Sequence, residues 1–257
     1  MRIYTDCPDQ LGGFFTDPPG WRLYNPPDLN EADLSLWQGL RNTPTLWGAE
    51  IPYRGLARLL IVEKASDSQY DILRGLLKEG HALPDGTAAL ALEGDGFHGR
   101  FNRPWRALRG NIHLSVYQRI SVPVQQAAAG LSMLPAVAAL EAIMASCGPA
   151  CGAGIKWVND ISMQGCKVAG VLTAAQSKGT RLEHVVSGIG INVETAPQVP
   201  PTPFVPKAGS LRSAGPDDGV TMPSVFWNLL QVWSGRFAEL KQLGSAPLLE
   251  AYRKPVS

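Results

Sequence analysis

The residues best suited to chemistry lie in the stretch 155–192. Lys156, Asn159 and Asp160 bring a cation, an amide and a carboxylate together within five residues, and Lys167 follows shortly after them. The surrounding sequence is apolar enough to be core, and burying a lone charge is costly. Such a cluster therefore either pairs internally or binds a charged ligand, and the residue types alone leave both interpretations open.

Two predicted strands position this cluster. The apolar, β-branched runs Lys167–Ala175 and Leu182–Val193 flank a polar turn at Gln176–Thr180, which is the pattern of an antiparallel pair. The charged and polar groups then fall at strand ends. Gly188 and Gly190, in the second run, would let backbone N–H and C=O groups approach a ligand closely.

A second concentration of functional groups lies in residues 94–111. This stretch holds Arg100, Arg103, Arg106 and Arg109, four glycines and few apolar residues, which indicates a mobile loop rather than a packed element. Neighbouring arginines repel one another unless an anion joins them, so the stretch is either a solvated cationic loop or a clamp for phosphate and carboxylate. Because the loop leads directly into a predicted strand, we favour the clamp.

Three sequence blocks, in this order, resemble the catalytic core of biotin protein ligases. They are Lys156–Asp160 (KWVND), Lys167–Leu172 (KVAGVL) and Gly188–Asn192 (GIGIN), beside the family patterns KWPND, K-hydrophobe-AGIL and G-hydrophobe-GIN. Val158 stands where the family usually has Pro. The resemblance implies an enzyme that uses ATP and Mg²⁺ to convert biotin to biotinyl-5′-AMP. It would then transfer the biotinyl group to a lysine of a biotin carboxyl carrier protein domain.

The resemblance also implies roles for individual residues. Lys167 is expected to bridge the biotin carboxylate and the nucleotide phosphate in catalysis together with Arg100, while Asp160 is the candidate Mg²⁺ ligand or base for the incoming amine. The expected biotin contacts are Ser66, Asp67, Ser68, Gly94, His98, Gly99, Arg100, Lys167, Gly188 and Gly190. The expected ATP contacts are Arg103, Trp105, Asn111, Lys156, Asn159 and Asn192.

Several of these residues could instead have purely structural roles. Ser66 or Asp67 could simply cap the following helix, Lys156 could be an internal partner of Asp160, and Asn192 could be a strand-end turn residue. The family pattern is also incomplete, because Asp67 replaces Thr, Gly94 replaces a common Gln, and Phe97-His98 replaces Gly-Arg. A non-catalytic relative that binds biotin or an adenylate is therefore the alternative function. A ligase for another acyl group such as lipoate is a further one, although the Arg-Arg-x-x-Gly-Gly-type segment usual in those enzymes is not found.

The expected fold follows mainly from the resemblance. It is an α/β (α+β) fold of the class II aminoacyl-tRNA synthetase/biotin synthetase type, with a mixed, mostly antiparallel sheet and packed helices. Residues 57–257 would form the catalytic domain. Residues 1–56 would be a Pro-rich extension packed on it, with a helix at Leu29–Leu40 and otherwise turn and extended chain. No winged-helix domain and no C-terminal SH3-like barrel are expected.

The pattern along the rest of the chain predicts the remaining elements. Strands are expected at Leu59–Glu63, Gly86–Glu93 and Ile112–Ile120, and helices at about 70–78, Val124–Cys147, about Met222–Leu243 and Ala246–Tyr252. The long helix near the C-terminus should bury an apolar stripe that includes Phe226, Trp233 and Phe237. Residues 196–218 read as surface connection.

Composition limits the function classes. The chain has 257 residues and a net charge of +1, so no broad field would hold nucleic acid or an anionic membrane. We expect no export signal and no membrane-spanning helix. The four cysteines and four histidines lack the spacing of a zinc site. We therefore expect a cytoplasmic protein with reduced cysteines, and a homodimer is left open.

Overall fold

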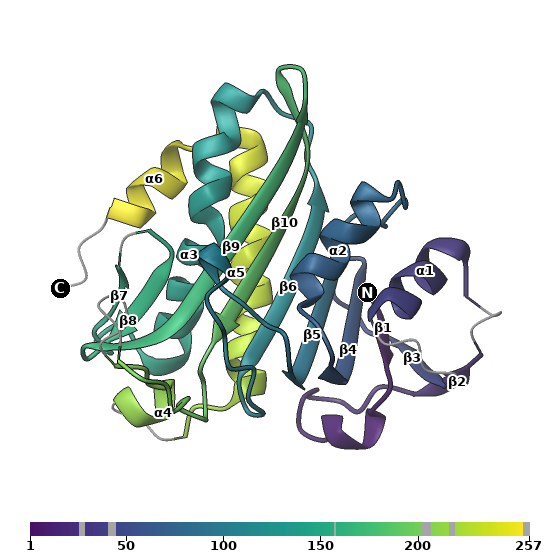
Figure 1. Cartoon of the computed structure of the whole chain (residues 1–257), viewed down its shortest axis with the longest axis horizontal. Coiled ribbons are helices and arrows are strands. Elements are labelled where there is room, and N and C mark those ends of the chain that lie inside the picture. Colours follow the sequence, from purple (N-terminus) through teal and green to yellow (C-terminus); the bar gives the residue numbers. More distant parts are fainter. Residues whose placement is uncertain (26–28, 41–44, 157, 202–206, 216–218, 254–257) are drawn as a thin grey trace.

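One mixed sheet runs through the part of the molecule that the computed structural model describes, namely residues 1–25, 29–40, 45–156, 158–201, 207–215 and 219–253. Its strands are β1 (Arg2–Thr5), β2 (Arg22–Tyr24), β3 (Leu46–Glu50), β4 (Arg58–Ala65), β5 (Thr87–Gly94), β6 (Ile112–Arg119), β7 (Ala153–Lys156), β8 (Asp160–Met163), β9 (Cys166–Lys178) and β10 (Arg181–Ile191). Their order across the sheet is β2-β3-β1-β4-β5-β6-β10-β9-β8-β7 (Figure 1). Pairing is antiparallel except for β1/β4 and β4/β5, which are parallel.

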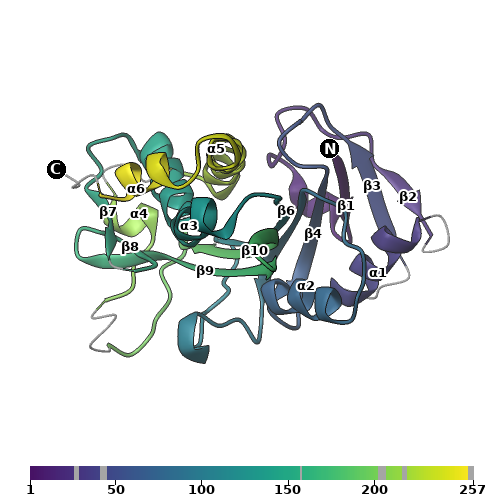
Figure 2. The same ribbon diagram turned by 90° about the horizontal axis from the view of Figure 1, so that it is seen from above.

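Helices cover both faces of this sheet. α1 (Glu31–Leu40) and α2 (Gln69–Lys78) lie on one face, while α3 (Val124–Cys147), α5 (Met222–Leu243) and α6 (Ala246–Arg253) lie on the other (Figure 2). The sheet is thus buried between two helical layers over much of its width, which suits its long runs of fully buried Leu, Ile, Val and Ala. The predicted fold class, a mostly antiparallel sheet with packed helices, is confirmed.

The strand pair predicted around the chemical cluster is also confirmed. β9 and β10 pair in antiparallel register from Arg181↔Lys178 to Ile191↔Ala169, with one irregularity between Leu182 and His184. β10 pairs on its other side with β6, which sets Gly190 opposite His113 and Gly188 opposite Ser115. The two glycines of the GIGIN block therefore lie inside the sheet, between the first halves of β6 and β9.

α3 packs as a core helix. It has no acidic or basic residue in its first or last turn, and its middle, including Pro135, is buried. By length and composition alone it is the one helix among the described residues that could span a membrane, although the sequence was expected to hold no run long and apolar enough. However, 67% of its most apolar window is buried inside the protein, as for a core helix packed between a sheet and other helices.

α5 has clear start and stop signals. Thr221 caps its N-terminus by accepting a hydrogen bond from the Ser224 backbone N–H, and Gly244, with φ of +74°, ends it. Its predicted stripe, including Phe226, Trp233 and Phe237, is buried against the core, which confirms that prediction.

The N-terminal segment contributes more regular structure than the sequence indicated. Besides α1, it forms three strands, because β1 pairs in parallel with β4 and recruits β3 and β2 to the edge of the sheet (Figure 1). α1 is fixed to β4 by Asp33, which ion-pairs with Arg58 and accepts hydrogen bonds from Tyr4 Oη at 3.1 Å and Asn30 Nδ2 at 2.8 Å. The expectation of turn and extended chain around one helix is therefore corrected.

The stretch expected to be surface connection also needs correction. Ser210 caps a short helix, α4 (Leu211–Ala214), and the chain just before it runs beside β9. There the Lys167 N–H donates to the Lys207 carbonyl at 2.9 Å, and the Gly209 N–H donates to the Lys167 carbonyl at 3.0 Å. This segment therefore reaches the predicted chemical cluster.

Candidate active site

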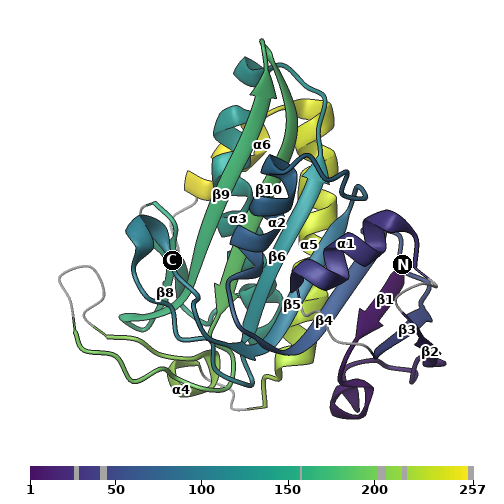
Figure 3. The ribbon, with the colours of Figure 1, turned by 45° about the vertical axis from the view of Figure 1, so that its right-hand side comes forward.

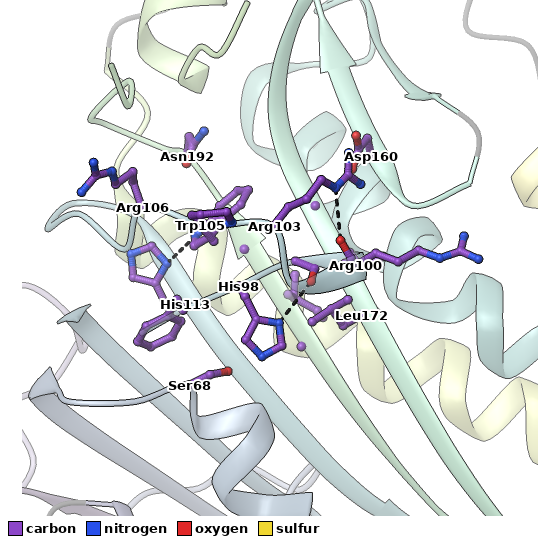
Figure 4. A pocket seen from close by; sticks show the side chains of 18 of the residues that line it. Ser68, His98, Arg100, Arg103, Trp105, Arg106, His113, Asp160, Leu172 and Asn192 are labelled. Carbon is purple, nitrogen blue, oxygen red and sulfur yellow. Dashed lines mark hydrogen bonds between the residues drawn. The ribbon is translucent and has the colours of Figure 1, made fainter. Parts of the chain in front are cut away.

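A cavity of about 430 Å³ lies on the α1/α2 face of the sheet, above the glycines of β10. Its walls come from the start of α2, from β6, β9 and β10, from the chain between β5 and β6, and from the segment after β10 (Figure 4). The lining residues are Ser68, Tyr70, Phe97, His98, Gly99, Arg100, Arg103, Pro104, Trp105, Arg106, His113, Leu114, Ser115, Asn159, Asp160, Lys167, Gly170, Val171, Leu172, Gly188, Ile189, Gly190, Asn192, Pro197, Val199, Pro200 and Ala208. The wall is thus mostly apolar and aromatic with a few charged groups, as is typical of small-molecule sites.

The segment between β5 and β6 forms a hairpin, residues 94–107, which we call the flap (Figure 3) and which contributes several of the lining residues. Backbone bonds close it at three levels: Gly94 N to Ala107 O at 3.0 Å, Trp105 N to Phe97 O at 2.9 Å, and Gly99 N to Arg103 O at 2.7 Å. At its tip Phe101 has φ of 58° and Asn102 has φ of 56°, both in the left-handed region. The expectation of a loop rather than a packed element is therefore corrected in part, because the backbone groups of this stretch pair with one another.

The arginines of the stretch separate into two sets. Arg100, Arg103 and Arg106 line the cavity, whereas Arg109 pairs outside it with Glu63 at 3.2 Å and Glu93 at 3.1 Å. Figure 4 shows the Arg103 side chain directed toward Asp160, with its Nε donating to the Arg100 carbonyl at 3.1 Å. The lining set places positive charge at the cavity, as an anion clamp requires.

Lys167 lies at the start of β9 and lines the cavity. Its ammonium is 2.7 Å from Asp160 Oδ1 and 5.8 Å from the centroid of the Trp105 ring, and its side chain is 19% exposed. Lys167 is thus an ion-pair partner of Asp160 in the cavity wall. Because both side chains line the cavity and are partly exposed, an anion that enters the cavity can reach the ammonium and compete with Asp160 for it.

One acceptor atom in the lining, Asn192 Oδ1, lacks a hydrogen-bond donor among the described residues. Asn192 is held in place from its other side, since its Nδ2 donates to the Gly209 carbonyl at 2.9 Å. A buried acceptor without a donor costs about 1–3 kcal/mol, so this atom is suited to receive a donor from a ligand.

Two histidines in the cavity wall have opposite charge preferences. His113 is buried on β6, and this burial lowers its pKa to about 4. His98 lies on the flap, with Nδ1 3.1 Å from the Gly99 carbonyl and Nε2 2.5 Å from Asp71 Oδ2. The hydrogen bond to the Gly99 carbonyl, followed by the contact with Asp71, raises the pKa of His98. His113 is therefore neutral, while His98 is arranged to favour its charged form.

Most of the residues singled out from the sequence come together in this cavity. Those that line it are Ser68, His98, Gly99, Arg100, Arg103, Trp105, Asn159, Asp160, Lys167, Gly188, Gly190 and Asn192. Those that do not line it are Ser66, Asp67, Gly94, Asn111 and Lys156. The negative charge of Asp67 therefore does not enter the cavity wall.

The positions of Asn111 and Gly94 have structural explanations. Asn111 Oδ1 accepts hydrogen bonds from the backbone N–H groups of residues 193, 194 and 195, and its Nδ2 donates to the Thr195 carbonyl at 2.9 Å. It thus fixes the chain that leaves β10. A Cβ on Gly94 would lie 2.5 Å from the Phe97 ring and 2.7 Å from the Ala65 carbonyl, so this position favours glycine for space alone.

Several lining residues were missed at the sequence level. Tyr70 and His113 belong to a helix start and a strand that read as core, and Phe97 is an apolar residue in the Arg-rich stretch, so none of the three gives a local signal of a ligand site. Pro197, Val199 and Pro200 lie in the stretch read as surface connection. Only the pairing of that stretch with β9 brings them to the cavity, which depends on tertiary structure.

Comparison with known proteins bears on these observations. The biotin/lipoate A/B protein ligase family matches residues 70–192. The chain is 31% identical over 185 residues to the bifunctional ligase/repressor BirA of Bacillus subtilis, covering 70% of this chain and 56% of that protein. It is 34% identical over 182 residues to the biotin–[acetyl-CoA-carboxylase] ligase of Paracoccus denitrificans, covering 68% of this chain and 73% of that one. The chain thus spans little more than half of the Bacillus relative.

A solved structure shares the fold. The biotin protein ligase from Leishmania major, in complex with biotinyl-5-AMP, matches with a TM-score of 0.59 and 18% identity, covering 76% of this chain and 79% of that one. At this level of identity the likeness supports the architecture of the sheet and its helices, and no more.

Proposed function

The chain belongs to the biotin/lipoate A/B protein ligase family, and we propose that it is an ATP-dependent biotin protein ligase. In this proposal biotin and ATP form biotinyl-5′-AMP and pyrophosphate, and a lysine of a carrier domain then takes the biotinyl group. The acceptor would be a biotin carboxyl carrier domain, since the Paracoccus relative is named for acetyl-CoA-carboxylase. We place the reaction in the cytoplasm and leave the oligomeric state open.

One observation carries the proposal. The lining of the cavity is mostly apolar, and it includes the Lys167–Asp160 ion pair and three flap arginines. Biotin has an uncharged ring system with a polar ureido group, an apolar thioether ring and alkyl chain, and a carboxylate at the end of that chain, so a mostly apolar lining with a few polar and charged groups would suit it. The charged groups would then hold the carboxylate and the α-phosphate against each other.

Lys167 has the central role in the first step. A carboxylate oxygen must attack the α-phosphorus while pyrophosphate leaves, and the two anions repel one another as they approach. An ammonium shared between them offsets this repulsion most where the charge concentrates in the transition state. The ion pair with Asp160 would hold the Lys167 side chain at the cavity until the substrates arrive.

The flap arginines and the amide groups would complete the binding. Arg100 and Arg103 carry the guanidinium groups suited to carboxylate and phosphate oxygens. Asn159 is fixed by its Nδ2, which donates to the Val171 carbonyl at 2.9 Å, and the free acceptor on Asn192 suits an N–H or O–H of the nucleotide.

Magnesium would find few ligands on the protein itself. Among the described residues no three His, Cys, Asp or Glu side chains gather as a metal-binding group, and Asp160 is the carboxylate in the cavity wall. Mg²⁺ typically keeps several waters and takes one or two carboxylates plus substrate phosphates, so a single Asp160 fits an ion that arrives with the nucleotide. When bound, the ion would neutralise phosphate charge.

The test is pyrophosphate release by the full chain with ATP and magnesium, in parallel reactions with biotin, with lipoate and without an acid. Biotin-dependent release supports the proposal. Lipoate-dependent release would assign the enzyme to the other acyl group. Biotin binding without release would make the chain a non-catalytic relative.

A further inference from the structure

His113 occupies a special place in the sheet. It lies on β6 with 3% of its surface exposed, directly opposite Gly190 of β10. The indole of Trp105, from the returning arm of the flap, lies over Gly190, so a Cβ there would be only 2.6 Å from the ring. Because Gly190 has no side chain, the Trp105 ring can pack directly over it. His113 lies next to Gly190 on the adjacent strand, β6.

Hydrogen bonds to both ring nitrogens fix the state of His113. Nε2 is 3.1 Å from the Leu108 carbonyl, an acceptor, and Nδ1 is 3.3 Å from Trp105 Nε1, a donor (Figure 4). These partners require a neutral ring with the proton on Nε2, and burial holds the ring neutral by lowering its pKa to about 4. The imidazole thus receives the indole N–H on one side and is anchored to the chain before β6 on the other.

The position of Trp105 matters because of what lies beside it. Its ring is close to Gly170 of β9, where a Cβ would be 3.5 Å away, and its centroid is 5.8 Å from the Lys167 ammonium. The ring therefore forms the wall of the cavity next to the charged end. A sideways shift of this ring would change the space in which the nucleotide and the acid meet.

We propose that His113 is a positioning residue that holds the Trp105 indole over Gly190 and thereby fixes the flap wall beside Lys167. Its effect on catalysis rests on the proposed function, whereas its effect on Trp105 does not. The residue acts through Trp105, so its loss should weaken substrate binding more than it slows the chemical step.

Two substitutions of similar polarity separate this role from general packing. In His113→Asn the side-chain oxygen takes the place of Nδ1 and can still accept from the indole. In His113→Gln the amide nitrogen takes the place of Nε2. This variant keeps the hydrogen bond to the Leu108 carbonyl and loses the acceptor for the Trp105 indole N–H. Both shorten or reshape the side chain and should destabilise the fold to a similar degree, so the difference between them reports on the indole contact.

The direct readout is the indole N–H resonance of Trp105 in ¹⁵N-tryptophan-labelled full-length protein, assigned by its disappearance in Trp105→Phe. We expect His113→Asn to keep a hydrogen-bonded, slowly exchanging proton, and His113→Gln to shift the resonance and exchange at least about tenfold faster, the loss of a hydrogen bond of about 1.4 kcal/mol. Equal behaviour of the two variants would overturn the proposal. If His113→Gln does not fold, fast exchange in the wild-type or His113→Asn protein would overturn it and slow exchange in both would support it.

The kinetic readout is the KM for ATP and for biotin in adenylate formation. His113→Gln should raise the KM for at least one substrate about three- to tenfold while kcat stays within about twofold, and His113→Asn should raise that KM clearly less. Parallel losses of kcat in both variants would show a structural role only. A wild-type protein that forms no adenylate contradicts the proposed function, and the indole resonance still decides whether His113 positions Trp105.

Discussion

At the scale of single residues, the charge at the cavity depends on which arginines face inward. Arg100 and Arg109 come from the same Arg-rich stretch, yet Arg100 lines the cavity and Arg109 is engaged with Glu63 and Glu93 outside it. The Arg100 guanidinium lies 4.8 Å from the centroid of the neighbouring Phe101 ring and extends away from the other labelled side chains in Figure 4. In the contacts described it has no carboxylate partner, so its charge is available to an anion that enters the cavity.

This difference predicts opposite outcomes for two alanine substitutions. Arg100→Ala should raise the KM for biotin by about tenfold or more, because a hydrogen bond to a charged group contributes about 1.5–3 kcal/mol. Arg109→Ala removes the same charge from the same stretch and should leave KM within about twofold. Steady-state pyrophosphate release over a range of biotin concentrations measures both. Equal effects of the two variants would show that only the net charge of the stretch matters.

At the scale of elements, the flap and the strand glycines form one assembly. Trp105 lies over Gly190, and Tyr70 of α2 lies over Gly188, where a Cβ would be 3.4 Å from the ring. These contacts explain why strand positions that could carry β-branched residues hold glycine. The resemblance implied that both glycines lie close to a ligand. In the structure, the aromatic rings of Trp105 and Tyr70 also pack over these glycines.

The two glycines should therefore respond differently to the same change. Gly190→Ala forces the Trp105 ring to move and should cost about 1–3 kcal/mol, the range for overpacking a filled site. Gly188→Ala adds an ordinary van der Waals contact with Tyr70 and should cost clearly less. Urea denaturation of both variants measures the difference. A larger loss of stability in Gly188→Ala than in Gly190→Ala would contradict the packing of the Trp105 ring over Gly190.

The flap has a pH-dependent attachment as well. His98 joins it to Asp71 of α2, and the pKa of His98 is raised above its ordinary value of 6.5 by the Gly99 carbonyl and Asp71. This attachment is fully formed below pH 6.5 and is lost as the pH rises through the raised pKa of the closed flap. We expect hydrogen exchange of flap amides, corrected for intrinsic rates, to accelerate about two- to fivefold between pH 6 and pH 8.5. His98→Gln should remove that dependence, and an unchanged dependence in this variant would show that another group controls the flap.

Elements with strong local patterns could be predicted, and sites built by long-range contact could not. The pair β9/β10 and helices α3 and α5 follow from apolar periodicity and turn residues that are visible locally. The strands at the N-terminus could not be read, because β1 has four residues and exists through its pairing with β4 and β3. The ring contacts of Tyr70, Phe97 and His113 likewise arise only when distant elements meet.

At the scale of the whole molecule, the N-terminal segment shares the sheet but lies away from the cavity (Figure 1). We propose that residues 57–257 carry the catalytic function and that residues 1–56 stabilise the edge at β4. The ion pair between Asp33 and Arg58 holds this segment in place, with the Asp33 side chain 1% exposed and the Arg58 side chain 18% exposed.

Breaking this attachment should affect stability and leave the chemistry unchanged. Asp33→Ala leaves Arg58 without its buried partner and should lower the free energy of unfolding by about 2–3 kcal/mol, near the low end for buried pairs because Arg58 is partly exposed. Glu50→Ala, which removes an exposed pair with Arg2, should cost less than about 1 kcal/mol. Chemical denaturation measures both. A slower rate of adenylate formation in folded Asp33→Ala would contradict the proposal that residues 1–56 stabilise the sheet edge and take no part in catalysis.

The account as a whole depends on the ammonium of Lys167 acting where an acid and a nucleotide phosphate meet. Lys178, at the opposite end of the same strand and exposed, is a matched control. The measurement is single-turnover formation of biotinyl-5′-AMP by the wild-type, Lys167→Ala and Lys178→Ala proteins, with circular dichroism to confirm folding. We predict a loss of about a hundredfold or more for Lys167→Ala and wild-type rates for Lys178→Ala. A folded Lys167→Ala protein that forms the adenylate at the wild-type rate would contradict the account.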